Sequence, residues 1–490
     1  MTIDYKIIRQ SIAEMDASAA SSATGVDRPI PSQIFAPEHH VGALDPNTTI
    51  VLGARGAGKS FWAGVLVHED TRSAVAAAYP QVDLNTLTAE VGFSGQAGDG
   101  SVSRATIDAL VEPGAERVKA VLLWRCVILR AVLRSADPDM PRKKISTMMV
   151  EYADPEEWEE AMEVADRKLA QTGSRVLIIF DALDGLSEHW SRLRDLTDAL
   201  LEVAWSIRGY KMVRAKLFLR PDQLRDLGLR FVELPKMTSG ATNLVWLGVD
   251  LYGLLFARLV TTQNAKASKA FRDLLDAANV PPAPPGLVVG LRRWRLSRSR
   301  PMQAKVFRHL AGDFMGRSNK KGRTYDWPLN HLADGHREVT PRSFLTLMIA
   351  AANAASPPDS QALSAEGIRI GLRQASKVRL EQLDTEFKWI KRVLAPLARL
   401  QVPCSADAII DRWEESSTIA AVMKQARIRE FLPPFQPSME SEEEEEENVR
   451  LISRLVRMGV LTQRADGRFD MPDLFRVAAR LLRKGGVAPE

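Results

Sequence analysis

The sequence predicts an α/β fold, in which a parallel β-sheet is followed by an all-helical part and a helix, hairpin and helix at the end. Three observations carry this prediction. Apolar runs such as Val176–Phe180 recur between helical stretches, a pattern typical of parallel strands buried on both faces. Another apolar run, at residues 50–52, leads through a glycine-rich stretch directly into a helix. Strand signals then fade after Leu255, and helices dominate to about residue 400.

The glycine-rich stretch is a complete G-x-x-x-x-G-K-[ST] motif, Gly-Ala-Arg-Gly-Ala-Gly-Lys-Ser at residues 53–60. The backbone N–H groups of such a loop cradle a phosphate chain, and we expect Gly53 and Gly58 to permit the turn. Lys59 is expected to reach the β- and γ-phosphates, and Ser60 to complete the shell of a bound Mg²⁺. The predicted nucleotide contacts are Gly53, Arg55, Gly56, Ala57, Gly58, Lys59, Ser60 and Phe61.

The remaining elements of the core follow in order along the chain. We predict strands at 47–52, 87–93, 176–180 and 216–220, and a further strand at 244–247. A helix over 59 to about 78 follows the phosphate loop, a helical insertion occupies about 104–172, and another helix spans 188–208. Alternation of strands with helices indicates a parallel, layered sheet.

Two carboxylates follow the strand at 176–180, in the sequence Phe180-Asp181-Ala182-Leu183-Asp184. We expect the strand of Asp181 to neighbour the phosphate-loop strand, so that Asp181 holds Mg²⁺ through water. Asp184 is then positioned to orient or polarise the attacking water. The alternative is that Asp184 only caps the following turn or pairs with a base.

Arg220 ends the strand that follows along the chain, at the edge of the sheet where ligands of open α/β folds collect. A guanidinium there is able to contact the γ-phosphate and report its hydrolysis. Alternatively, Arg220 pairs with an acid such as Asp222 and has no catalytic part.

These motifs resemble those of the signal-transducing STAND ATPases and their AAA+ and KAP relatives, over residues about 35 to 350. The resemblance implies ATP and Mg²⁺ as ligands, with Lys59, Asp181, Asp184 and Arg220 in the catalytic site. Pro341-Arg342-Ser343-Phe344-Leu345 is similar to the lid signature of that group, which implies that Arg342 meets the nucleotide. Position 185 departs from the pattern because it is Gly where the group often has Glu, and 122 positions separate Lys59 from Asp181.

We therefore divide the chain into four parts. These are a flexible lead-in (1–30), a P-loop core (31–255) with its helical insertion, a helical lid (256–375) and a winged-helix-like domain (376–490). In the last part we predict a helix at Val449–Gly459, a hairpin around Asp466-Gly467 and a helix at Pro472–Lys484. Its basic residues, Arg476, Arg480, Arg483 and Lys484, favour a phosphate backbone, whereas in STAND-like proteins such a module more often packs on the nucleotide domain.

The charge is unevenly distributed. The net charge of the chain is +5, yet residues 292–323 carry eleven Lys or Arg and one acid, so this basic segment has +10 and the rest −5. Trp294, Phe307 and Tyr325 lie in or beside it, and bases could stack on them while the cations track phosphates. The alternative is a charged lid that answers acidic surfaces, such as the run Glu442–Glu447.

Composition bounds the class of protein. The 490 residues suggest about three domains. Cys126 and Cys404 lie in no C-x-x-C or Cys/His cluster, which argues against a disulfide framework or a zinc site. The N-terminus lacks the apolar region of a secretory signal, and Leu244–Val260 is short for a membrane span and contains charged residues. We expect a cytoplasmic protein that does not enter the membrane.

Three functional hypotheses remain open. The first is an ATP-hydrolysing switch, such as a bacterial regulatory or anti-phage ATPase, whose state is read by a separately encoded effector or by other copies in a homo-oligomer. The second is a nucleic-acid-bound motor or loader that uses the basic segment and the winged helix. The third is a scaffold that binds ATP but hardly hydrolyses it, which the glycine at position 185 favours. The sequence Asn319-Lys320-Lys321-Gly322 lacks the acid of a guanine-recognising motif, so ATP is favoured over GTP.

Overall fold

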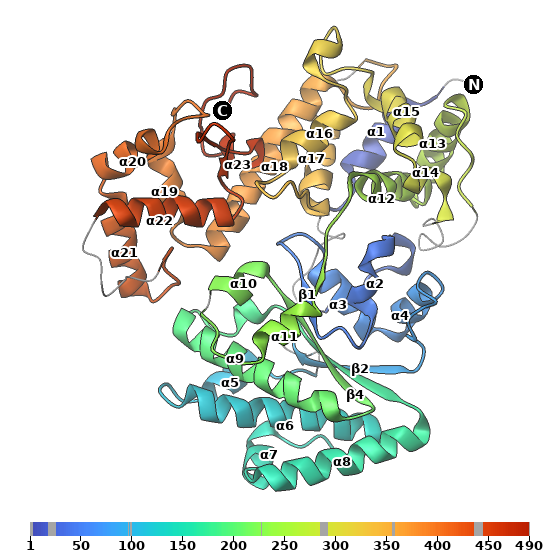
Figure 1. Cartoon of the computed structure of the whole chain (residues 1–490). Helices are drawn as coiled ribbons and strands as arrows, with labels where there is room; N and C mark the ends of the chain where they lie inside the picture. The colour runs from blue at the N-terminus through green and yellow to red at the C-terminus, as the bar shows by residue number, and fades with distance from the viewer. Residues whose placement is uncertain are drawn as a thin grey trace. The chain divides into compact units, whose positions relative to one another are not determined.

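The computed structural model describes residues 3–17, 26–96, 98, 100–226, 228–284, 293–354, 358–435 and 444–489. Its contacts divide the chain into two compact units (Figure 1). We call residues 18–244 the sheet unit and residues 1–17 together with 245–490 the helical unit. Arg292 and Glu442–Glu443, which belong to the predicted basic segment and acidic run, lie outside the described residues.

The sheet unit contains a five-stranded, all-parallel sheet in the order β2-β3-β4-β1-β5. The strands are β1 (Ile50–Leu52), β2 (Leu87–Phe93), β3 (Arg175–Phe180), β4 (Val213–Leu219) and β5 (Thr242–Asn243). The prediction of a parallel sheet is therefore confirmed. The fifth strand lies just before the predicted 244–247, where Leu244 still donates its N–H to the Leu52 carbonyl at 2.7 Å.

Both faces of the sheet are covered, as the apolar strands require. Val176, Ile178 and Phe180 of β3 belong to the core beneath α6 (Glu116–Ala136) and α9 (Trp190–Ser206). Leu177 and Ile179 alternate with them and are equally buried on the opposite face. Figure 1 shows α6 and α9 on one side of this sheet and α3 (Lys59–Val67) on the other.

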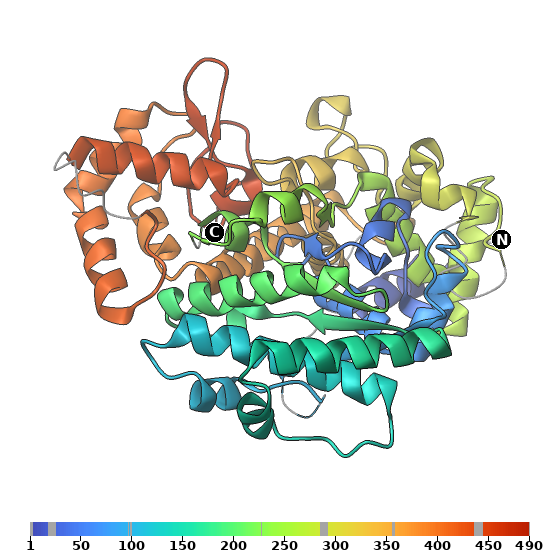
Figure 2. The same ribbon diagram turned by 60° about the horizontal axis from the view of Figure 1, so that its bottom comes forward.

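The other helices of the sheet unit are mostly short. The predicted insertion contains α5 (Arg104–Leu110), α6, α7 (Ile145–Glu151) and α8 (Pro155–Thr172), and Figure 2 shows α6 beside α8. The helix predicted over 59–78 is divided at His68, whose backbone is extended, so that α4 (Glu69–Ala76) follows α3. The unit also contains α2 (Val41–Leu44), α10 (Pro221–Asp226), α11 (Leu234–Ser239) and 3₁₀ turns at Pro31–Gln33, Glu38–His40, Leu183–Gly185 and Ile207–Gly209.

The helical unit surrounds an aromatic core. The ring of Tyr252 stacks on Tyr325 at 4.1 Å between centroids and meets Phe307 and Phe344 edge-on, each at 5.0 Å. Its first helices are α1 (Tyr5–Ala13), α12 (Gly248–Val260), α13 (Ala265–Ala277), α14 (Arg295–Arg298), α15 (Arg300–Ala311), α16 (Asp326–Leu332) and α17 (Pro341–Asn353), with a 3₁₀ turn at Asn319–Lys321.

The N-terminal residues differ from the expected flexible lead-in. Tyr5–Ala13 form helix α1, which Asp4 caps and which packs against α13 and α17. The reason is amphipathic spacing, since Ile8 and Ile12 are four positions apart and both fully buried. Part of the Ala- and Ser-rich stretch of the predicted lead-in, residues 18–25, lies outside the described residues.

The C-terminal part contains α18 (Ala365–Glu386), α19 (Ile390–Leu394), a 3₁₀ turn at Ala395–Leu397, α20 (Ala406–Glu415), α21 (Thr418–Arg429) and α22 (Glu444–Arg457). An antiparallel hairpin follows, of β6 (Thr462–Gln463) and β7 (Phe469–Asp470), and Gly467 in its turn has φ 82°. The helix predicted at 472–484 is confined to α23 (Asp473–Arg476). Arg480 has φ 61°, and Leu482 then pairs with Gln401, so the chain leaves the helical path.

No helix in the described ranges combines the length and the apolar character that a bilayer span needs.

Candidate nucleotide-binding site

The phosphate loop begins where β1 ends. Gly56 and Gly58 have φ of 85° and 103°, values that side chains with a Cβ rarely adopt, and Gly58 is the N-cap of α3. Gly53, which we expected to permit the turn in the same way, does not have a positive φ. It is needed for space, because a Cβ there would lie 3.3 Å from Ala57, Leu244 and Lys59 side-chain atoms.

Lys59 lies at the first position of α3 and bends back over the loop. Its Nζ donates to the carbonyl oxygens of Gly53 at 2.8 Å and Ala54 at 3.4 Å. The ammonium is thus held at the mouth of the loop, at a helix N-terminus whose backbone dipole favours anions. Lys59 and Ser60 are half-buried, as are Arg55 and Phe61.

Asp181 lies beside the same loop, although its strand is not the neighbour of β1. β4 intervenes between β1 and β3, which corrects the expected adjacency. The Ser60 side chain nevertheless lies close enough to the Asp181 carboxylate to lower its pKa. The motif serine and the strand-end acid therefore converge as predicted for a metal site, at the carboxyl end of the sheet.

The carboxylate of Asp181 is 1% exposed and is under-satisfied. Burial raises its pKa to about 6, and the nearby Asp184 also raises it, while the Ser60 side chain, the Lys59 charge and the Ala182 N–H oppose the shift. Within the described residues its Oδ2 atom has no hydrogen-bond partner. A buried carboxylate oxygen without a partner, next to a serine hydroxyl, suits Mg²⁺, whose preferred ligands are hard oxygens.

Arg220 follows β4, between the other two strand ends, and is 12% exposed in its side chain. Its Nε and Nη2 bind Asp222 in a fork, at 3.1 Å each to Oδ1 and Oδ2. Its Nη1 donates to Asp184 Oδ2 at 2.9 Å. The sequence left open that Arg220 pairs with an acid such as Asp222 and that Asp184 pairs with a basic residue. Both ion pairs are present, and the guanidinium of Arg220 forms both of them.

Asp222 also belongs to the candidate site. The sequence indicated it only as a possible partner of Arg220. Burial acts to raise its pKa, but the charge and hydrogen bonds of Arg220 outweigh burial and hold that pKa below the ordinary value. The neighbouring Gln223 is 4% exposed and accepts the Arg220 N–H at Oε1, at 2.8 Å. Pro221 at the start of α10 was the one local signal for this turn.

Position 185 has room for a longer side chain. Gly185 ends the 3₁₀ turn Leu183–Gly185, and a Cβ added there would meet no atom within 4 Å among the described residues. The absence of Glu at this position is therefore not imposed by packing. The preceding turn is constrained instead at Ala182, which has φ 52° without being glycine.

Arg342 is the one predicted site residue that lies in the helical unit, near the N-terminus of α17. Its approach to the nucleotide stays a prediction.

Comparison of the chain with models of protein families, with curated proteins and with solved structures gives no match. The function is therefore argued from the site itself.

Proposed function

We propose that the protein binds ATP and Mg²⁺ and hydrolyses ATP as a regulatory switch. The observation that carries the proposal is the meeting of three strand ends: the phosphate loop after β1, Asp181 after β3 and Arg220 after β4. The Oδ2 of Asp181, which has no hydrogen-bond partner among the residues that the structure describes, lies near the Ser60 side chain and adds a fitting place for the metal. Mg²⁺, when bound there, would neutralise charge on the phosphate oxygens.

Each side chain then has a distinct part. The loop N–H groups and Lys59 bind the phosphate chain, and Ser60 and Asp181 hold the metal. Arg220 exchanges Asp184 for the terminal phosphate, because a phosphate carries more charge than one half-exposed carboxylate. Asp184, once released, accepts a proton from the attacking water or orients it. Asp222 keeps the guanidinium in place throughout.

This arrangement favours action within one chain. Arg220 is held in its own chain by Asp184 and Asp222, so it would sense the phosphate bound to the same P-loop. Arg55 stays a candidate for a finger directed at a neighbouring copy. We propose that the readout is assembly into a homo-oligomer or binding of a separately encoded partner, as the resemblance to STAND and KAP proteins suggests, with anti-phage defence as one setting.

Several observations argue against the alternative of a nucleic-acid motor. Trp294, Phe307 and Tyr325 are at most 3% exposed, so they offer no stacking surface, contrary to our expectation. Arg476 and Arg483, predicted to face phosphates, are hydrogen-bonded inside the C-terminal part. Helix α22, which precedes the hairpin as a recognition helix would, begins with four glutamates.

Steady-state hydrolysis by the full chain tests the proposal, with Lys59→Ala and Asp181→Asn beside the wild type, each with and without single- and double-stranded DNA. We expect turnover that both substitutions reduce by about 10²-fold or more and that DNA leaves unchanged. Strong stimulation by DNA would support the motor instead. Tight ATP binding without turnover would support the scaffold.

A further inference from the structure

A basic pocket lies within the helical unit, independent of the phosphate loop. Its volume is about 780 Å³. Three segments line it: the turn around Lys320–Arg323 with the start of α16, the first half of α18, and the C-terminal residues 485–488. The cationic side chains that line it are Lys320, Lys321, Arg323, Arg369 and Arg373, and the acidic one is Asp326.

The positive charge of this pocket is poorly balanced. Asp326 is already paired with Arg300 at 2.8 Å. Glu366, on α18, is shared by Arg369 at 2.9 Å and Arg373 at 3.7 Å.

Lys320, Lys321 and Arg323 are exposed, and in the described part of the chain none of the three forms an ion pair. Converging cations that lack acids indicate an anionic ligand.

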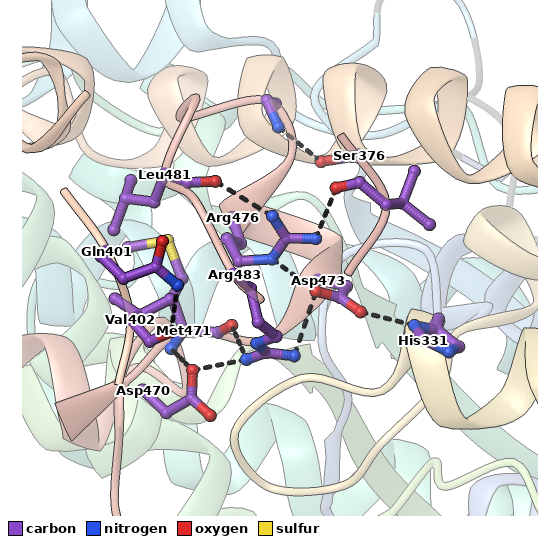
Figure 3. Close-up of polar contacts among 12 residues, drawn as sticks. His331, Ser376, Gln401, Val402, Asp470, Met471, Asp473, Arg476, Leu481 and Arg483 are labelled. Carbon is purple, nitrogen blue, oxygen red and sulfur yellow. Dashed lines mark hydrogen bonds and ion pairs between the residues drawn. The ribbon is translucent and has the colours of Figure 1, made fainter. Parts of the chain in front are cut away.

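One wall of the pocket is fixed by a buried network (Figure 3). Arg476, fully buried, donates to the carbonyls of Leu481 at 3.0 Å and Val487 at 2.8 Å. Arg373 donates from Nε to the Ala488 carbonyl at 3.3 Å. The C-terminal residues are therefore held in position as a wall before any ligand binds, which lowers the ordering cost of binding.

The same network also includes His331, which lines the pocket. Its Nδ1 meets Asp473 Oδ2 at 2.5 Å, and Asp473 in turn accepts from Arg476 Nε at 2.6 Å and Arg483 Nη1 at 3.1 Å (Figure 3). The ring of His331 stacks on Trp327, with 4.0 Å between centroids. Since Trp327 is also 8% exposed, the aromatic side of the pocket offers no free face to a nucleobase.

The shape of the pocket further selects among anions. Cations that contact a nucleic-acid backbone are arranged along the strand, whereas these five converge from two segments, the 320–323 turn and α18, on one concavity. A compact polyanion matches convergent charges better than an extended strand does. Arginines can also bind phosphate oxygens in a bidentate manner, and α18 supplies two of them one helical turn apart.

We propose that this pocket is a second ligand site, which takes a compact molecule carrying two or more linked phosphates. The ligand is held through its phosphate chain by Lys320, Lys321, Arg323, Arg369 and Arg373. The proposal does not depend on ATP binding at the phosphate loop. Free polyphosphate and the phosphate chain of a nucleotide share this chemistry.

Calorimetric titration of the full-length Lys59→Ala protein tests the proposal, because that substitution weakens the phosphate loop. The probes are inorganic triphosphate, ATP, and single- and double-stranded oligonucleotides, at about 0.15 M ionic strength. The pocket variant carries Lys320→Gln, Lys321→Gln and Arg323→Gln, all at exposed positions. The matched control removes the same charge from exposed positions outside the pocket, with Lys388→Gln, Lys424→Gln and Arg429→Gln.

We expect triphosphate to bind the control as it binds the parent, and the pocket variant to bind it at least about tenfold more weakly. Arg373→Gln alone should weaken it by a smaller factor. If the pocket variant loses ATP and triphosphate affinity by the same factor, the site reads the phosphate chain. If both affinities fall but that for ATP falls further, the ligand is a nucleotide. Equal affinity of the pocket and control variants for triphosphate, or binding of oligonucleotides without triphosphate, would overturn the proposal.

Discussion

Two arginine–carboxylate networks, one in each unit, use the same chemistry in different surroundings. At the candidate nucleotide site, Arg220 contacts Asp184 and Asp222, whose side chains are 44% and 19% exposed. In the C-terminal part, Arg476 and Asp473 are 0% and 3% exposed. Removing one partner of a buried pair strands a charge, whereas an exposed partner is rehydrated at little cost. The first network is therefore able to exchange partners, and the second serves as a fixed support.

Substitution of Arg476 should have the largest effect, because it leaves Asp473 buried with fewer partners. We expect Arg476→Met to lower the free energy of unfolding by about 3 to 5 kcal/mol, as measured by urea denaturation. Lys484→Met, at an exposed position nearby, is the control and should change it by less than about 0.5 kcal/mol. Similar values for the two variants would mean that the network is not a support.

The pH dependence of stability should have opposite signs at Asp181 and Asp473. The folded-state pKa of Asp181 is raised to about 6, so its stabilising contribution is present below its unfolded pKa of 3.8 and lost as the pH rises through 6, by about 3 kcal/mol. Burial acts to raise the pKa of Asp473, but His331, Arg476 and Arg483 lower it to about 2. Its contribution is present above 3.8 and lost as the pH falls toward 2.

Unfolding free energies of metal-free Asp181→Asn and wild-type protein, compared between pH 4 and pH 6.5, measure the first of these contributions. As the pH rises over this interval, the free energy of unfolding of the wild type should fall relative to that of Asp181→Asn. A constant difference would show that Asp181 is ionised with an ordinary pKa.

Arg220→Gln should separate function from stability. We expect hydrolysis to fall by about 10²-fold, since the guanidinium no longer binds the terminal phosphate, while the free energy of unfolding falls less than in Arg476→Met. Arg225→Gln, at an exposed position on α10, is the control for turnover. A large loss of stability in Arg220→Gln with normal turnover would make Arg220 a structural residue like Arg476.

Gly185→Glu sharpens the comparison by adding a carboxylate next to the exchangeable network. Because the position is open, we expect the variant to fold normally and to hydrolyse ATP about tenfold faster. Gly185→Gln has the same size without the base and should not be faster than wild type. Equal rates for the two variants would show that a missing base does not limit turnover.

The sequence predicted the parts of the fold that depend on local patterns. The strands that hold the site were found because apolar runs buried on both faces are continuous in sequence, as at Val176–Phe180. The positions of Lys59, Asp181 and Arg220 at strand ends were predicted from the sequence motifs. The place of β4 between β1 and β3 was not, because no local pattern encodes strand order.

The wrong predictions concern side chains that were expected at the surface but are buried by residues distant in the sequence. Trp294 and Phe307 lie among cations, and only the packed helices reveal that their rings face inward. Arg476 and Arg483 look exposed in a basic sequence, but distant backbone carbonyls and Asp473 take up their donors. The forked pair of Arg220 with Asp222 was foreseen as an alternative because the two are close in sequence.

The placement of α1 has a consequence for the order in which the protein is made. The helix belongs to the unit that otherwise begins at Val245, so its packing partners α13 and α17 are synthesised only after the whole of the sheet unit. During translation Ile8 and Ile12 of α1 therefore have no packing partners while residues 18–244 leave the ribosome. Residues 18–244 are free to fold in that interval. Helix α1 can therefore reach its place in the helical unit only after residues 265–353 have been made.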